Sequence, residues 1–199
     1  PMASGLLPLT FGEATKFSQM LLDADKVYEA GVELGVETDT GDAEGQVLAA
    51  HPVAVTELAL REVLERFVGE IEQVPPMYSA LKRDGKPLYE YARAGIELER
   101  EARRVTISAI ELLSFDSPRF VIRVACSKGT YIRTLAMDIG AALGGGAHLY
   151  SLRRTRIGVF DIASSVSLDA LEAVEGDARD GMLASADLLV MNFDRVDLD

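Results

Sequence analysis

Hydrophobic and polar residues alternate between positions 27 and 36, where the sequence reads VYEAGVELGV. Every second side chain from Tyr28 to Val36 is apolar, which is the pattern of a strand that buries one face. Apolar segments bounded by turn residues predict three further strands, over 105–113, 120–126 and 148–158. These stretches indicate that a sheet forms the centre of the protein.

A different spacing, with apolar residues one helical turn apart, predicts two longer helices. The first begins at the N-cap Thr56, ends near Gly69 and carries Leu60, Val63, Leu64 and Phe67 on one face. The second spans 131–143, with Thr130 as its predicted cap and a stripe of Ile132, Leu135, Ala136, Ile139 and Leu143. Shorter helices are expected over 13–22, 88–94 and after Ser167. Helices and strands do not alternate strictly, so we predict an α+β fold whose mixed, mainly antiparallel sheet is flanked by helices.

Composition narrows the class of protein. The 199 residues contain one cysteine, Cys126, which predicts a small core residue and no internal disulfide. No apolar run reaches the length of a membrane span and no leader is apparent, so a cytoplasmic protein without membrane contact is expected. P-loop, dinucleotide and zinc patterns are absent, and His51 and His148 are isolated from each other, so no metal or cofactor is predicted. The acids of the segment 38–47 do not have calcium-loop spacing and predict a solvated hairpin.

The charge of the chain is unevenly distributed. A net charge of −12 argues against a nucleic-acid partner. Between 119 and 160, however, Asp138 is the sole acid among seven basic residues: Arg119, Arg123, Lys128, Arg133, Arg153, Arg154 and Arg156. A basic surface on an acidic protein is therefore compatible with the sequence.

The stretch CSKGTYIRTLAMDIG places two of these cations, Lys128 and Arg133, at the start of the predicted helix 131–143. Helix N-termini are already positive, so two cations there indicate a nearby anion, either a phosphate or a carboxylate. Arg133 borders the apolar stripe, which favours a partly buried guanidinium with a carboxylate partner. The alternative is that both side chains extend into water.

Aromatic residues supply the other candidates. Tyr28 lies near the start of its strand, where its ring borders a cleft or simply fills the core. In the long segment 73–95, Tyr78, Tyr89 and Tyr91 alternate with Lys82, Arg83, Lys86 and Arg93. Stacking rings beside cations are typical of an RNA-binding loop, although ordinary surface amphipathicity produces the same pattern.

Five stretches resemble the bacterial tRNA pseudouridine-55 synthases in the family's order and along nearly the whole chain. They read ASGLLPLTFGEATKFSQMLLDADKVY, GVETDTGDAEGQV, PPMYSALKRDGKPLYEYARAGIE, CSKGTYIRTLAMDIG and GGGAHLYSLRRTRIG. The resemblance implies the pseudouridine synthase fold and an enzyme that flips the T-loop uridine out of tRNA, breaks its glycosidic bond and rejoins the base through carbon 5. It implies tRNA, through its T-arm stem-loop, as the partner, with no cofactor and no obligate protein partner.

The same resemblance implies roles for individual residues. Tyr28 matches the tyrosine that stacks on the flipped base, and Arg133 matches the arginine that pairs with the nucleophilic aspartate. Tyr131 and Leu152 match walls of the pocket. The segment at about 70–104 matches the RNA-clasping insertion, so Tyr78, Lys82 and Tyr91 are expected to bind substrate, as is Lys128 at the cationic turn.

In this family the nucleophile precedes a proline that aligns with Pro1, so the catalytic aspartate is expected to lie outside these residues. Arg133 is then expected to lack its carboxylate partner and the 199 residues to be inactive alone. Residues 1–185 are expected to form the catalytic domain without its N-terminal part. Residues 186–199 are expected to begin the connection to an absent C-terminal RNA-binding domain.

Two other hypotheses stay open at this point. One is a non-catalytic tRNA-binding or RNA-folding factor that lacks the nucleophile and binds the T-loop in a salt-sensitive way. The other is an acidic globular domain whose cationic turn only contacts solvent.

Overall fold

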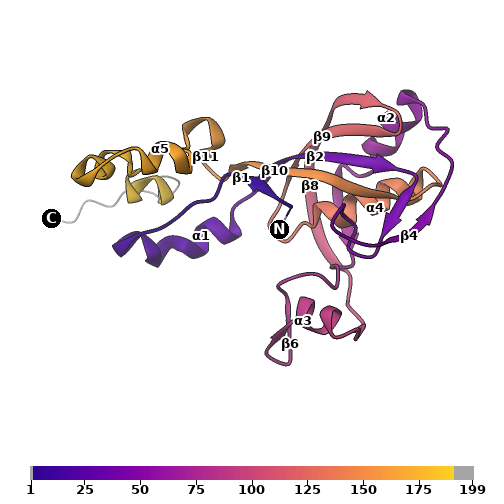
Figure 1. Ribbon diagram of the computed structural model, residues 1–199, viewed down its shortest axis with the longest axis horizontal. Helices are drawn as coiled ribbons and strands as arrows, with labels where there is room; N and C mark the ends of the chain where they lie inside the picture. Colours follow the sequence, from indigo (N-terminus) through magenta and orange to yellow (C-terminus); the bar gives the residue numbers. More distant parts are fainter. Residues whose placement is uncertain (1, 191–199) are drawn as a thin grey trace.

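The computed structural model describes residues 2–190 and places a seven-stranded sheet at the centre of the molecule (Figure 1). The strands lie in the order β1 (Ser4–Gly5), β10 (Ala147–Ile157), β2 (Lys26–Leu34), β9 (Arg119–Cys126), β8 (Arg103–Asp116) and β5 (Gly69–Gln73), and β11 (Phe160–Asp161) pairs with β10. Neighbouring strands are antiparallel except β1 and β10, which are parallel. The mixed, mainly antiparallel sheet is therefore confirmed.

One face of this sheet carries the core. Ala30 and Val32 of β2 and Phe120, Ile122 and Val124 of β9 are at most 1% exposed and belong to one apolar cluster. The cluster also contains most of the two predicted stripes, on α2 (Glu57–Arg66) and α4 (Ile132–Ala142). The last residue of each stripe, Phe67 or Leu143, follows its helix and packs against the cluster while partly buried. The two helices flank the sheet because their apolar positions recur at helical spacing and match this face. The α+β fold class is confirmed, and Cys126 is a core residue that is 1% exposed.

Two of the predicted elements are interrupted. The strand 27–36 stops at Leu34, and the chain continues as a hairpin of β3 (Val36–Thr38) and β4 (Val47–Ala50). The expected helix 13–22 is a 3-10 helix, η1 (Gly12–Phe17), followed by one short α-helix, α1 (Ser18–Asp23).

Helix starts test the capping predictions. The hydroxyl of Thr56 accepts from the backbone N–H of Ala59 at 3.3 Å and caps α2 as predicted. The predicted cap of α4 is wrong. The hydroxyl of Thr130 donates instead to the carbonyl of Ser127 at 2.9 Å, which closes the SKG turn. Tyr131 occupies the N-cap position, and no side chain of its own caps the helix.

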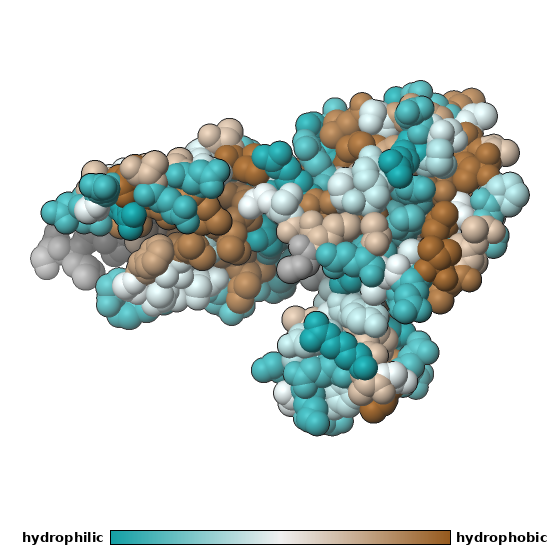
Figure 2. Space-filling model, viewed as in Figure 1, coloured by the Kyte–Doolittle hydropathy of each residue, from teal (hydrophilic) through white to brown (hydrophobic). Residues whose placement is uncertain are grey.

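Two extensions leave the sheet (Figure 1). Between β5 and β8 the chain forms an insertion with β6 (Lys82–Arg83), β7 (Lys86–Pro87) and α3 (Leu88–Arg93). Its visible surface is largely hydrophilic (Figure 2). At the other side, η1 and α1 project from the sheet in the same direction as α5 (Leu168–Glu172), which follows η2 (Ile162–Ser164) (Figure 1). After α5 the chain forms η3 (Gly176–Met182) and η4 (Ala186–Leu189), and η4 contacts η1.

Most of the predicted connection over 186–199 lies outside the described residues, as does Pro1. Within 2–190, no helix is long and apolar enough to cross a membrane. No group of three or more histidine, cysteine, aspartate or glutamate side chains in that range could hold a metal ion.

Candidate active site

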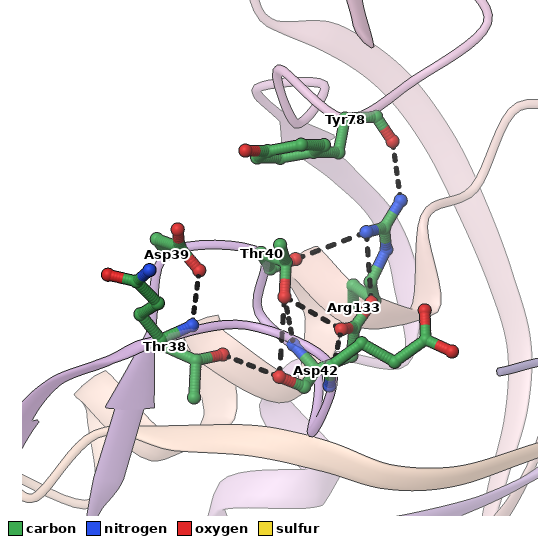
Figure 3. A network of polar contacts seen from close by, with 8 residues as sticks. Thr38, Asp39, Thr40, Asp42, Tyr78 and Arg133 are labelled. Atoms are coloured by element: carbon green, nitrogen blue, oxygen red, sulfur yellow. Dashed lines mark hydrogen bonds and ion pairs between the residues drawn. The ribbon is translucent and has the colours of Figure 1, made fainter. Parts of the chain in front are cut away.

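Arg133, in the first turn of α4, is the centre of a polar network that joins three parts of the chain (Figure 3). Its Nη1 donates to a carboxylate oxygen of Asp42 at 3.0 Å and to the carbonyl of Thr40 at 3.2 Å. Its Nη2 donates to the carbonyl of Tyr78 at 2.5 Å. The helix, the β3–β4 turn and the base of the insertion therefore meet at one guanidinium.

The β3–β4 turn holds Asp42 in a fixed orientation. The Oδ1 of Asp42 accepts from the Thr40 hydroxyl at 2.7 Å and from the Glu44 backbone N–H at 3.1 Å, which leaves Oδ2 for Arg133. Gly41 has a φ of 73°, and a Cβ there would lie 2.6 Å from the sulfur of Met137 on α4. A glycine at this position lets the turn pack directly on the helix.

The pair of Asp42 and Arg133 corrects two predictions. Arg133 is partly buried and has a carboxylate partner, as its place beside the apolar stripe indicated, but that partner is Asp42. The expectation that Arg133 lacks a carboxylate is therefore wrong. The acidic hairpin is not solvated throughout either, because the Asp42 side chain is 8% exposed and that of Arg133 is 22% exposed. An arginine with three oxygen acceptors meets the condition for a buried ion pair, namely that its remaining polar atoms also find partners.

The guanidinium retains capacity for a further anion. Arginine has five N–H donors, and the contacts with described residues use three of them. The Nε–H and one Nη2–H make no hydrogen bond to residues 2–190. A second carboxylate could therefore bind Arg133 without displacing Asp42.

Tyr131 and Tyr78 adjoin this network. The backbone N–H of Tyr131 donates to the side chain of Gln73 at 3.0 Å, and its carbonyl accepts from that side chain at 3.3 Å. The ring of Tyr78 lies over the β3–β4 turn, on the side of Thr40 (Figure 3). The structure thus brings together Arg133, Tyr131 and Tyr78.

Tyr28 and Leu152 lie on the neighbouring strands β2 and β10. Tyr28 is opposite Arg154, and Leu152 is opposite Ala30. β1 runs along the other side of β10, where the Arg154 Nε donates to the carbonyl of Leu6 at 2.9 Å. Burial raises the pKa of the Tyr28 phenol, and the positive charge of Arg154 offsets part of that effect. No hydrogen bond joins Tyr28 to Arg133 within 2–190.

The N-terminal strand approaches this part of the sheet very closely. Gly5 has a φ of 100°, and a Cβ on it would lie 2.2 Å from the backbone oxygen of Arg154. Only glycine permits that approach. The chain that leads into β1 is therefore held beside the strand that carries Leu152.

The remaining candidates lie at the periphery. Lys128 is exposed and forms an ion pair with Asp23 at 2.9 Å, so its anion in this structure is a carboxylate of α1. This contact lowers the pKa of Asp23. Lys82 is exposed on β6, and the hydroxyl of Tyr91 donates to the carbonyl of Arg83 at 3.1 Å. Both belong to the projecting insertion.

Sequence reasoning missed Asp42 and Gln73. Thr38 and Thr40, which precede Gly41, are the signal for the turn that contains Asp42, because both hydroxyls donate to that residue. Nothing local marks Gln73, whose partner is 58 positions away in the sequence.

Two family models match the chain. The model described as TruB family pseudouridylate synthase (N terminal domain) matches residues 1–132. The chain belongs to this family. The model described as tRNA pseudouridylate synthase B C-terminal domain matches residues 133–191. The two models meet at the start of α4, although the structure buries that helix in the same core as β2 and β9.

Curated relatives agree with this family. A protein of Azoarcus sp. (strain BH72) named tRNA pseudouridine synthase B is 71% identical over 198 residues, and one of the same name from Aromatoleum aromaticum is 65% identical over 199. Each match covers 100% of this chain and 66% or 65% of the relative. The chain thus spans about two thirds of the length of these relatives.

Solved structures share the fold. A chain in the structure titled Crystal Structure of a Cbf5-Nop10-Gar1 Complex is 30% identical with a TM-score of 0.71, covering 94% of this chain and 50% of that one. A chain in the structure of an H/ACA RNP bound to a substrate RNA containing 2′-deoxyuridine is 30% identical with a TM-score of 0.61, covering 86% and 40%. The expected pseudouridine synthase fold is confirmed.

Proposed function

We propose that the protein containing this chain isomerises the T-loop uridine at position 55 of tRNA to pseudouridine. The relatives named tRNA pseudouridine synthase B, which are 60 to 71% identical to this chain over its whole length, support the reaction class. The observation that carries the proposal is Arg133, which is fixed by three oxygen acceptors and keeps two N–H groups for a further anion. The proposed substrate is tRNA, so we expect the protein to act in the cytoplasm.

In this proposal Arg133 orients the nucleophilic aspartate and keeps it ionised, because a guanidinium stabilises the charged form of a carboxyl. Asp42 neutralises part of the charge on Arg133 and holds its plane in place. The uridine is flipped from the T-loop, its N1–C1′ bond breaks, the base rotates and carbon 5 bonds to C1′. The C5 proton leaves and N1 gains one, so the product is an isomer.

The other candidate residues receive substrate-binding roles. Tyr28 stacks on the flipped base, and its neutral phenol can accept or donate a hydrogen bond there. Tyr131 and Leu152 form walls of the pocket. Residues at about 70–104 form the RNA-clasping insertion, in which Tyr78 and Tyr91 offer aromatic surface and Lys82 a charge for phosphate, as does Lys128 at the SKG turn. We assign residues 1–185 to the catalytic domain and the segment from 186 to the connection that follows it.

The test is tritium release from a T-arm stem-loop that carries [5-³H]uridine at position 55, using the full-length gene product without any other protein. Release is expected with the wild type and is expected to fall by roughly a thousandfold or more with Arg133→Ala, because the nucleophile is no longer oriented. Arg61→Ala, which removes an exposed arginine of α2 paired with Glu57, is the matched control and should leave the rate unchanged. In this family the nucleophilic aspartate directly precedes a proline, and residues 1–199 contain no aspartate followed by proline, so that chain alone is expected to bind the stem-loop without releasing tritium.

A full-length protein that binds the stem-loop and releases no tritium would overturn the proposal in favour of an RNA-binding factor. Release that requires an added protein would refute the expectation that no partner is needed. Equal rates for Arg133→Ala and Arg61→Ala would refute the assigned role of the network.

A further inference from the structure

Gln73 ends β5 at the point where the insertion begins, and its side chain is almost fully enclosed. The residue is 2% exposed. Its Oε1 accepts from the Tyr131 backbone N–H at 3.0 Å, and its Nε2 donates to the Tyr131 carbonyl at 3.3 Å. One carboxamide therefore satisfies both backbone groups of a single residue, as a neighbouring strand would.

This contact occurs where α4 lacks a cap of its own. Tyr131 is the N-cap, with φ of −98° and ψ of 107°, and no side-chain cap is present. The N–H groups at a helix start have no partner within the helix and need one from elsewhere. Gln73 supplies an acceptor for Tyr131 from another element, so the end of β5 fixes where α4 begins.

The same helix turn carries Arg133, whose Nη2 bonds to the carbonyl of Tyr78. Gln73 and Tyr78 both belong to the base of the insertion, so that base is attached to the first turn of α4 at two points. Release of the first attachment would leave Tyr131 and Arg133 free to shift relative to the β3–β4 turn.

We propose that Gln73 is a positioning residue for the proposed isomerisation: it holds the start of α4, and with it Tyr131 and Arg133, against the base of the insertion. This inference rests on the proposed function. The buried carboxamide of Gln73 takes no direct part in the proposed chemistry, but it places Tyr131 and Arg133, which do.

The first test is Gln73→Met in the full-length protein, since methionine has nearly the same length and cannot form either hydrogen bond. The single-turnover rate of tritium release is expected to fall roughly 10- to 100-fold, the order that a small misplacement costs. The dissociation constant of the stem-loop should change by less than about threefold, because the cationic surface of the insertion is unaltered. Gln19→Met is the matched control, since Gln19 is an exposed glutamine whose carboxamide, among residues 2–190, bonds to Asp23 alone.

Gln73→Glu adds a second measurement, the pH dependence of the rate, which a purely structural role of Gln73 would leave unchanged. The neutral carboxyl can both accept from the Tyr131 N–H and donate to its carbonyl, whereas the carboxylate opposes that carbonyl. Burial raises the pKa of a carboxyl, so the rate of this variant relative to wild type should rise as pH falls from about 8 to about 5.5. The relative rate of Gln73→Met should stay flat. Hydrogen exchange of the peptide that contains Tyr131 should be faster in the methionine variant.

The outcomes distinguish a failure of the proposed function from a failure of the role proposed for Gln73. A wild type without tritium release overturns the proposed function, and hydrogen exchange then still tests the attachment. An active wild type with an unchanged rate for Gln73→Met overturns the inference. The inference is also overturned if the loss of rate in Gln73→Met is fully accounted for by a smaller fraction of folded protein, or by a weaker affinity for the stem-loop. If the methionine variant does not fold, a pH-independent relative rate for Gln73→Glu overturns it.

Discussion

Replacing Asp42 by asparagine tests whether the ion pair in the candidate site stabilises the fold. Asparagine keeps the oxygen that accepts from the Thr40 hydroxyl and the Glu44 N–H, at 2.7 and 3.1 Å. It places an amide N–H₂ where Oδ2 receives the guanidinium of Arg133 at 3.0 Å. The substitution therefore removes the ion pair and changes the shape of the turn very little.

The size of the effect follows from burial. Removing one partner of a fully buried pair destabilises a protein by about 3–5 kcal/mol, because the other charge stays without compensation. The Arg133 side chain is 22% exposed and keeps its two carbonyl acceptors, so part of its charge can be hydrated or bonded. We expect Asp42→Asn to lower the free energy of unfolding by about 2 kcal/mol.

Urea unfolding followed by circular dichroism measures this change as a shift of the midpoint, on the order of 1 M at constant m-value. Asp39→Asn is the control, since the exposed Asp39 side chain accepts from the Gln46 N–H at 2.8 Å and forms no ion pair with any described residue. Its expected effect is below about 1 kcal/mol. A double-mutant cycle with Arg133→Met should give a coupling of about 1–3 kcal/mol. An Asp42→Asn midpoint equal to that of Asp39→Asn, or additive effects in the cycle, would show that the ion pair does not stabilise the fold.

Four further outcomes are expected. Thr56→Ala removes the cap of α2 and should lower the free energy of unfolding by about 1 kcal/mol in the same urea assay, and an unchanged midpoint would contradict it. Burial raises the pKa of Cys126 to about 11, so its thiol should react with a disulfide reagent near pH 8 far more slowly in the native protein than in urea. The pKa of Tyr28 is raised in the folded state, so the contribution of its phenol to the free energy of unfolding is complete below the ordinary tyrosine pKa of 10.0. That contribution is lost as pH rises through the folded-state pKa. The stability of the wild type should therefore decline relative to Tyr28→Phe above pH 10, as measured by urea midpoints. If Lys128 binds RNA phosphate, Lys128→Ala should weaken binding of the stem-loop and reduce its salt slope by about one, whereas Asp23→Ala, which frees Lys128, should strengthen binding.

The fold was predictable where a local pattern decides it. In β9 buried side chains alternate with more exposed ones, and in β2 apolar residues alternate with glutamate or glycine from Tyr28 to Leu34. α2 and α4 repeat apolar residues every turn, so none of these four elements needs knowledge of its partner to be predicted. The predicted ends of helices and strands were less accurate, because the ends depend on caps and close contacts. Thr130 is of the right type to cap α4, yet its hydroxyl closes the preceding turn.

For the candidate site, the sequence indicated that Arg133 needs a carboxylate partner, but not which residue supplies it. The position of Arg133 indicated that a carboxylate should lie beside it, and one does. Its identity was not accessible, since Asp42 is 91 residues away in a segment whose composition is that of a solvated hairpin. The same holds for Lys128, whose partner Asp23 is 105 residues distant. The Lys128–Asp23 pair follows from the sheet order, because β2 and β9 are neighbours and Lys26 lies opposite Cys126, which brings the residues before β2 next to those after β9.

The large sequence separations between these residues affect how the site forms. Arg133 receives its acceptors from the β3–β4 turn and from the base of the insertion, and Gln73 fixes the helix turn on which it lies. The β3–β4 turn, the base of the insertion and α4 are far apart from one another in sequence, so no fragment of the sheet alone can orient the guanidinium. The geometry that would hold a second carboxylate therefore exists only when the insertion base, the turn and α4 are packed together. A substitution that loosens any one of the three should reduce the order of Arg133 before it unfolds the core, because Leu135 and Ile139, two and six residues further along the helix, stay fully buried.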